Sequence, residues 1–299
     1  MPTRKRGRTH HHHHKRRTRR KKRGFQKARC SPVTASDNLR YTCFTSRGLH
    51  RLRDVWNMRH SDLKITSNDP RKIWDSLRKY MRSSCDNEMC WLRQQCIKHG
   101  VDRSMLTSFA PLAPNEWKKK PFDWLSSLEI QGVMRQWEKA RSDFAFIGPS
   151  PINYDEHVLF DECVWEELCK FSLRQYIKRG KTKIGIIFNL DTHRRNGSHW
   201  VALFIDTKKG TICYFDSYGE KIPKRITKFI DTVKEQSGAL GKKYELCTMK
   251  RRHQYSESEC GMYCLYFIIE LIKGRSWKSF EKRRISDKHM RKLRKIYFN

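Results

Sequence analysis

The sequence predicts an α+β fold, in which a central sheet is flanked by helices and follows a helical N-terminal region. Two observations support this prediction. Short apolar runs separated by turn residues occupy much of the segment 183–250, which is typical of neighbouring strands. Apolar residues recur at helical spacing before residue 140, and the run from Met262 to Ile272 is typical of a buried helix that ends at Gly274.

The composition limits the class of protein. The 299 residues suffice for one sizeable core and an accessory region. The formal net charge of +34 favours a polyanionic partner such as nucleic acid. No run reaches the roughly 18 apolar residues of a membrane span, and no secretory signal follows the basic N-terminus. We therefore expect no membrane partner and, despite 11 cysteines, reduced thiols in an intracellular compartment.

Residues 1–47 are predicted to form a basic, largely disordered arm, because the polybasic segment 1–24 cannot bury apolar surface. This segment contains five histidines at positions 10–14, to which we assign no catalytic role. A nucleic-acid tether, a nuclear localisation signal and a solvated polybasic tail all fit the composition.

Residues 48–115 are predicted to form a helical accessory domain. Asp69 and Pro70 suit the N-cap and first turn of one helix, and a second is expected from Asn87 to His99. The same region offers four soft metal ligands, Cys85, Cys90, Cys96 and His99. Their spacing fits no common zinc site, and reduced cysteines often pack as small apolar side chains, so we predict no metal.

Residues 116–299 are predicted to contain the sheet. An amphipathic helix is expected to open at Trp124, and the apolar segment 144–147 precedes a turn-rich connection at 148–151. A helix near 222–236 and a short capped helix after Ser286 complete this part. The expected strands are Lys183–Leu190, Trp200–Asp206, Thr211–Asp216 and Tyr244–Lys250.

A predicted hairpin brings two polar side chains together. A turn centred on residues 208 and 209 pairs positions whose numbers sum to about 417, and His199 and Asp216 sum to 415. We expect both at one end of the hairpin, where a carboxylate can hold an imidazole in one tautomer. His193 and His253 are alternative bases, and Asp216 could instead only begin a turn.

Cys260 stands at the beginning of the buried helix, where unpaired backbone N–H groups and the helix dipole favour a thiolate. Gln254, six residues upstream, could donate an amide hydrogen bond to an oxyanion, with the backbone N–H of Cys260 as the second donor. Together with His199 and Asp216, these residues predict nucleophilic catalysis by a thiol. The alternative is that Cys260 is a packing residue in a cysteine-rich chain.

Three motifs carry a family resemblance. Ser198-His199-Trp200, the step of 17 residues to Asp216, and Gln254-x5-Cys260-Gly261 are similar to the SUMO-specific proteases and the adenovirus protease. Trp124-Leu125 resembles the pair that opens the substrate-side helix of SUMO proteases.

More narrowly, residues 70–299 resemble the SUMO-protease-like cysteine proteases of nucleocytoplasmic large DNA viruses, including the African swine fever virus polyprotein-processing protease. The supporting motifs are Cys85-Asp86-x-Glu88-x-Cys90, Gly197-x-His199-Trp200-Val201-Ala202, Arg252-His253-Gln254 and Arg284-Ile285-Ser286-Asp287-x-x-Met290.

The resemblance implies a papain-like α+β cysteine protease core. It assigns catalysis to His199, Asp216 and Cys260, the oxyanion hole to Gln254, and substrate binding to two tryptophans, Trp200 and Trp124. The African swine fever virus enzyme has an amide as third triad member, where this chain has Asp216. An acid at this position is the commoner choice in SUMO proteases.

The implied activity is hydrolysis after Gly-Gly motifs in viral structural or core precursor proteins, for virion maturation. The expected location is the virion and the cytoplasm of the infected cell, with nuclear targeting by the basic arm as an alternative. No cofactor is expected apart from DNA as an activator, by analogy with the adenovirus relative. DNA or another polyanion would bind the arm.

Two other functions remain open. The chain could remove host ubiquitin-like modifiers from their conjugates, which would require the folded modifier, whereas a maturation protease accepts short peptides. It could also be a basic nucleic-acid-packaging protein on the same scaffold. Loss of a triad member would favour the packaging function, and none is lost here.

Overall fold

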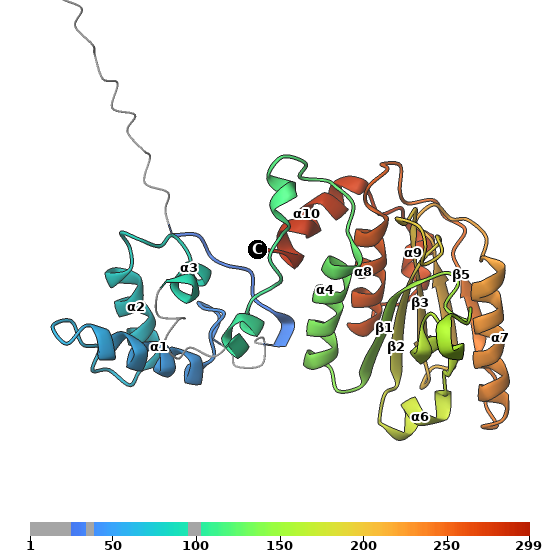
Figure 1. The fold of residues 1–299 in the computed structure, drawn as a ribbon, viewed down its shortest axis with the longest axis horizontal. Coiled ribbons are helices and arrows are strands. Elements are labelled where there is room, and N and C mark those ends of the chain that lie inside the picture. The colour runs from blue at the N-terminus through green and yellow to red at the C-terminus, as the bar shows by residue number, and fades with distance from the viewer. Residues whose placement is uncertain (1–24, 34–38, 95–102) are drawn as a thin grey trace, which may run out of the picture.

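The computed structural model describes residues 25–33, 39–94 and 103–299 (Figure 1). A single five-stranded sheet, in the order β1-β2-β3-β4-β5, is found in these residues. Its outer pairs β1–β2 and β4–β5 are parallel, and the two inner pairs are antiparallel. The predicted α+β fold with a mixed sheet is confirmed. The strands are β1 (Phe144–Pro151), β2 (Lys183–Asn189), β3 (Trp200–Asp206), β4 (Thr211–Phe215) and β5 (Glu245–Thr248).

Helices cover both faces of the sheet (Figure 1). One core contains α4 (Ser127–Ala140), α8 (Cys260–Ile272) and α10 (Asp287–Tyr297) with alternate residues of β3, such as Ala202 and Phe204. The other core contains α6 (Leu173–Lys178) and α7 (Lys224–Gly238) with the intervening residues of β3. The remaining described helices of this part are α5 (Glu166–Cys169), α9 (Lys278–Lys282), η4 (Asn115–Lys118) and η5 (Leu159–Asp161). In the described ranges, no helix is long and apolar enough to cross a bilayer.

The predicted hairpin register is correct. Ala202 pairs with Phe215, and Asp206 pairs with Thr211, so that both pairs sum to 417. The carboxylate of Asp206 accepts hydrogen bonds from the backbone N–H groups of Lys208 and Lys209 at 3.1 and 3.0 Å. These bonds close the turn and thereby fix which residues face each other at the far end of the hairpin.

Two segments before β2 differ from the prediction. β1 continues through 148–151 because its register shifts between Ile147 and Ser150, and this irregularity accommodates the prolines on an outer strand. The amphipathic helix α4 begins after Ser126, whose side chain forms a capping box with Glu129. Trp124 therefore belongs to the segment that precedes the helix.

The N-terminal region has its own core around α1 (Ser46–Arg59), α2 (Pro70–Tyr80), α3 (Glu88–Arg93) and η3 (Arg103–Ser108). Helix α2 begins after Asp69, whose carboxylate accepts from the backbone N–H of Arg71 at 2.7 Å, as predicted. Asn87 caps α3, as predicted, but this helix ends at Arg93 and not at His99.

Ordered structure begins earlier than the predicted arm boundary at residue 47. Ala28, Cys43 and Phe44 are buried in the N-terminal core, because the stretch from Phe25 onward contains the apolar residues that the polybasic segment 1–24 largely lacks. The predictions for segment 1–24, including the histidine run, lie outside the described residues.

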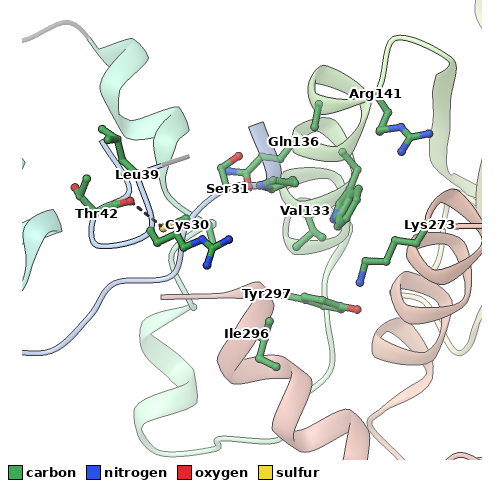
Figure 2. A pocket seen from close by; sticks show the side chains of 15 residues that line it. Cys30, Ser31, Leu39, Thr42, Val133, Gln136, Arg141, Lys273, Ile296 and Tyr297 are labelled. Atoms are coloured by element: carbon green, nitrogen blue, oxygen red, sulfur yellow. Dashed lines mark hydrogen bonds between the residues drawn. The ribbon is translucent and has the colours of Figure 1, made fainter. Parts of the chain in front are cut away.

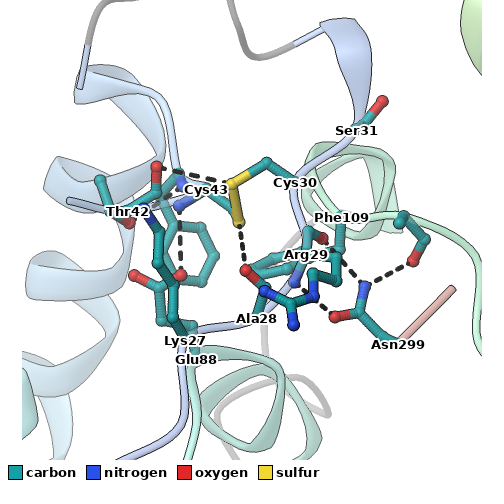
Figure 3. Close-up of a disulfide and its surroundings, with 12 residues drawn as sticks. Lys27, Ala28, Arg29, Cys30, Ser31, Thr42, Cys43, Glu88, Phe109 and Asn299 are labelled. Carbon is teal, nitrogen blue, oxygen red and sulfur yellow. Dashed lines mark hydrogen bonds between the residues drawn. A yellow bond between two sulfur atoms is a disulfide. The ribbon is translucent and has the colours of Figure 1, made fainter. Parts of the chain in front are cut away.

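The prediction of reduced thiols is wrong for six of the described cysteines, which form the disulfides Cys30–Cys43, Cys85–Cys90 and Cys163–Cys169 (Figure 3 shows the first). Composition does not show which sulfur atoms the fold brings within bonding distance. One disulfide uses two of the four candidate metal ligands, and the other two, Cys96 and His99, lie outside the described residues. The free described cysteines, all buried, are Cys213, Cys247, Cys260 and Cys264.

Asn299 joins the two parts of the chain (Figure 3). Its side-chain amide donates to the carbonyl oxygens of Arg29 and Ala110, both at 2.9 Å, and its Oδ1 accepts from the N–H of Arg29 at 2.6 Å. A cavity of about 590 Å³ lies beside this contact, between the segment around Thr42 and the helices near Val133 and Tyr297 (Figure 2).

Candidate active site

The β3–β4 hairpin places His199 beside Asp216. His199 directly precedes β3 and Asp216 directly follows β4, so both side chains lie at the same edge of the sheet. Nε2 of His199 is 2.7 Å from Oδ1 of Asp216, and the carboxylate is 1% exposed. The same oxygen accepts from the backbone N–H of Tyr218 at 2.9 Å. The carboxylate is therefore held in one orientation toward the imidazole.

Cys260 is the first residue of α8, and its thiol interacts with His199. Because Nε2 of His199 faces Asp216, Nδ1 is the nitrogen available to the thiol. Burial lowers the pKa of His199, but its hydrogen bonds with Asp216 and Cys260 outweigh burial and raise this pKa to about 9. The imidazole is thus protonated at neutral pH, as an imidazolium–thiolate pair requires.

Gln254 is buried and its amide has a fixed orientation. The Oε1 atom accepts from the hydroxyl of Ser217 at 2.7 Å, and Nε2 donates to the carbonyl oxygen of Ser256 at 2.6 Å and to the hydroxyl of Tyr218 at 3.3 Å. The backbone N–H of Gln254 donates to the carbonyl oxygen of Ser217 at 2.9 Å. These bonds join the loop that precedes Cys260 to the end of β4.

Sequence reasoning did not single out Ser217 and Tyr218 as site residues. Both directly follow Asp216, where the chain leaves β4, and this position is the signal that could have identified them. The next residue, Gly219, has a φ of +77°, and a Cβ there would lie 2.6 Å from the carbonyl oxygen of Lys250. Only glycine fits this turn without strain, which fixes how Tyr218 is presented.

Residues 180–299 match the model of the Ulp1 protease family, C-terminal catalytic domain. This segment is similar to the catalytic domain of Ulp1-type cysteine proteases. A mimivirus protein (Acanthamoeba polyphaga mimivirus) described as a thiol protease is 31% identical over 189 residues, which are 62% of this chain and 59% of the relative. A SUMO-1 cysteine protease of African swine fever virus is 25% identical over 256 residues, which are 81% of this chain and 93% of the relative.

The crystal structure of the African swine fever virus protease has a fold similar to that of most of this chain. It matches with a TM-score of 0.67 at 20% identity, and the match covers 91% of this chain and 96% of that one. The predicted resemblance to SUMO-protease-like viral cysteine proteases is therefore confirmed, including the helical N-terminal region.

The predicted substrate-binding tryptophans have different environments in the protease domain. Trp200 is 7% exposed, and its indole N–H donates to the carbonyl oxygen of Leu125 at 2.9 Å. Leu125 packs against Gly261, where an added Cβ would come within 2.9 Å of the Leu125 side chain. Trp200 and Leu125 thus form a rigid wall beside Cys260. Trp124 is 42% exposed and lines a shallow depression opposite Ser256.

The two alternative bases have other partners. His253 is fully buried, and its Nδ1 accepts from the backbone N–H of Ile285 at 3.1 Å. Burial, followed by the charges of Arg251 and Arg284, lowers the pKa of His253 to about 4, so this imidazole is neutral. Nδ1 of His193 lies 2.8 Å from the side-chain amide nitrogen of Asn153.

A buried ion pair fixes the start of α8 in the protease domain. Glu259 is the N-cap residue of α8 and is fully buried, and its Oε2 accepts from Nε of Arg294 in α10 at 3.0 Å. Burial raises the pKa of Glu259, and the nearby Arg294 guanidinium opposes this rise. The guanidinium also lies 4.6 Å from the ring centroid of Trp117. This ion pair joins helix α10 to the N-terminal end of α8, next to Cys260.

We expect Asp216→Asn to reduce kcat/KM by about 10²-fold and to shift the alkaline limb of its pH profile to lower pH. Activity should fall as pH rises through about 9, because His199 then loses its proton and the ion pair with Cys260 is lost. Asparagine removes the negative charge that raises the pKa of His199, so the fall begins earlier. Profiles of kcat/KM between pH 5 and 10 measure both effects.

Glu220→Gln is the matched control, because it removes the same charge from an exposed side chain four residues further along the chain. This control should keep the wild-type profile. An unchanged alkaline limb in Asp216→Asn would show that Asp216 does not determine the protonation of His199.

Proposed function

We propose that this protease is an endopeptidase that cleaves viral structural or core precursor proteins after Gly-Gly motifs, in the maturing virion and the infected-cell cytoplasm. The observation that supports it most strongly is the His199–Asp216 pair at 2.7 Å, with Cys260 against the same imidazole at the start of a buried helix. The viral origin of the relatives supports the class of substrate.

In the proposed reaction, the thiolate of Cys260 attacks the carbonyl carbon of the scissile peptide bond. The carbonyl oxygen becomes an oxyanion, which accepts from the side-chain amide of Gln254 and the backbone N–H of Cys260. The His199 imidazolium then gives its Nδ1 proton to the leaving amine, and the C–N bond breaks to leave a thioester. Water attacks the thioester with His199 as general base, which releases the acid and restores the thiolate.

The narrow access to the thiol supports selectivity for glycine. Cys260 is 1% exposed, and the rigid wall of Trp200 and Leu125 stands beside it. A substrate chain without side chains can approach such a thiol closely, whereas a Cβ at either residue nearest the cleaved bond would meet the wall. Glycine at both positions therefore suits the narrow approach to Cys260.

We expect Trp200→Ala to reduce the preference for a Gly-Gly peptide over an Ala-Ala peptide by about tenfold, because it removes the wall and its bond to Leu125. The measurement is kcat/KM for the two peptides. Trp277→Ala, which truncates a half-buried tryptophan before α9, is the control and should keep the preference. Equal losses on both peptides in Trp200→Ala would contradict the proposed wall.

The test of the proposed function compares two substrates under mildly reducing conditions, each with and without duplex DNA. One is a short fluorogenic Gly-Gly peptide, and the other is a folded ubiquitin-like modifier conjugated to a protein. A maturation protease should cleave the peptide. Cleavage of the conjugate alone would replace this function with deconjugation. DNA binding without cleavage of either would favour packaging.

The comparison with and without duplex DNA tests whether a polyanion activates the protease, which the net charge of +34 favours. An increase in peptide cleavage that disappears at high salt would support DNA as an activator. A rate of peptide cleavage that does not change with added DNA would contradict the proposal that DNA is an activator.

A further inference from the structure

Tyr218 contacts three residues of the active site. Its ring stacks on the imidazole of His199, with centroids 4.7 Å apart and an angle of 18° between the planes. Its hydroxyl accepts from Nε2 of Gln254 at 3.3 Å, and its backbone N–H donates to Oδ1 of Asp216 at 2.9 Å. One residue thus links the base, the carboxylate that orients the base, and the oxyanion donor.

We propose that Tyr218 is a positioning residue with two separable actions in the protease reaction. Its ring holds the imidazole plane of His199, and its hydroxyl holds the amide of Gln254 where the oxyanion forms. The inference rests on the proposed function, in which His199 and Gln254 have these roles.

The ring acts on the charge of His199. An aromatic face attracts a cation, so a stacked tyrosine stabilises the imidazolium relative to the neutral imidazole. Asp216 and the Cys260 thiolate also favour the imidazolium. The guanidinium of Arg252 is a second cation near the same ring, 5.1 Å from the Tyr218 ring centroid. Loss of the ring should therefore shift the alkaline limb of the pH profile to lower pH by about half a unit.

The hydroxyl acts on the second amide proton of Gln254. The first proton is donated to the carbonyl oxygen of Ser256 at 2.6 Å, and the second points to Tyr218. Because this contact is long, the second proton can be shared between the Tyr218 hydroxyl and an oxyanion in a three-centre hydrogen bond, and the hydroxyl keeps the amide in that orientation. Complete loss of an oxyanion donor costs about 10²–10³-fold in kcat. Ser217 still holds Oε1 of Gln254, so loss of the Tyr218 hydroxyl should lower kcat by a smaller factor, about three- to tenfold.

The guanidinium of Arg252 lies near both Tyr218 and Tyr255, so Tyr255 provides a control for Tyr218. Its Nε donates to the carbonyl oxygen of Gln254 at 2.9 Å, and its guanidinium lies 4.8 Å from the ring centroid of Tyr255 as well as near Tyr218. The other described partners of Tyr255, which is 61% exposed, are Arg284 and Asp287. Tyr255→Leu therefore changes an aromatic contact of the same guanidinium without touching the catalytic groups.

The experiment uses the full chain with Tyr218→Phe, Tyr218→Leu and Tyr255→Leu. Two quantities are measured from pH 6 to 10: kcat and KM for the Gly-Gly peptide, and the rate at which iodoacetamide alkylates Cys260, followed by mass spectrometry. The alkylation rate needs no peptide substrate, and its upper inflection reports the loss of the imidazolium proton. Thermal unfolding of each variant checks that it is folded.

Tyr218→Phe should lower kcat three- to tenfold, with KM and both alkaline inflections unchanged. Tyr218→Leu should lower kcat further and shift both inflections down by about half a unit, and Tyr255→Leu should shift neither. Wild-type inflections in Tyr218→Leu would overturn the role of the ring, and wild-type kcat in Tyr218→Phe would overturn that of the hydroxyl. An alkylation shift without any peptide cleavage by the wild type would uphold the ring's role while refuting the proposed function.

Discussion

Cys260→Ala is expected to abolish peptide cleavage, with a fall in kcat of about 10⁶-fold. The thiolate forms the only covalent bond to the substrate in the proposed reaction, and an alanine side chain offers no nucleophile. His199 and Gln254 would keep their places, because their partners Asp216 and Ser217 do not depend on the thiol. Substrate binding should survive, so the measurement pairs initial rates with peptide affinity by fluorescence anisotropy.

Cys264→Ala is the control for this variant. Cys264 is also a buried, free cysteine of α8, one helical turn further along, and burial raises the pKa of its thiol well above the usual range. This thiol therefore stays protonated and serves in packing. The control should retain cleavage within about threefold, at a small loss of stability. If Cys264→Ala abolished cleavage and Cys260→Ala did not, the nucleophile would be misassigned.

Arg294→Ala should destabilise the protease domain by about 3–5 kcal/mol, the largest effect on stability that we expect. Arg294 is 4% exposed, and its guanidinium faces the fully buried carboxylate of Glu259. Removal of the guanidinium leaves that carboxylate without its closest cation at the N-cap of α8. Denaturant-induced unfolding measures the change in the free energy of unfolding. Peptide cleavage should also fall, because the start of α8 carries Cys260.

Arg291→Ala is the matched control on the same helix. Its Nε lies 3.6 Å from Oε1 of Glu259, but its side chain is 42% exposed, so the change should stay below about 1 kcal/mol. The double variant Glu259→Gln with Arg294→Met removes both charges and should recover part of the lost stability. Equal effects of Arg291→Ala and Arg294→Ala would show that burial of the ion pair does not determine its strength.

The β3–β4 hairpin and helix α8, which carry the candidate catalytic residues, were predictable because their signals are local. The turn near Lys208 fixes a period-two register, so counting along the chain places His199 opposite Asp216. The helix from Cys260 to Ile272 is almost wholly apolar, and its beginning is visible where the polar loop ends. Both signals depend on neighbouring residues only.

The features that were missed depend on contacts between distant segments. No pattern near Glu259 indicates that Arg294, 35 residues away, will neutralise it in the core. Likewise, the approach of Cys30 to Cys43 depends on how a basic segment packs against the N-terminal helices. Tyr218 looks like an ordinary turn residue in the sequence, and only the structure shows that its ring stacks on the imidazole of His199.

The order of the catalytic parts along the chain has a consequence during protein synthesis. His199 and Asp216 emerge together on one hairpin, whereas Cys260 follows Asp216 by 44 residues (260 minus 216), and the partner of its N-cap, Arg294, emerges later still. Non-local contacts form only after the later segment is available. We expect ribosome-bound chains that end before Arg294 to contain the paired His199 and Asp216 but to hold the Cys260 thiol in a poorly defined position. Stalled or truncated products would then be harmless to neighbouring proteins.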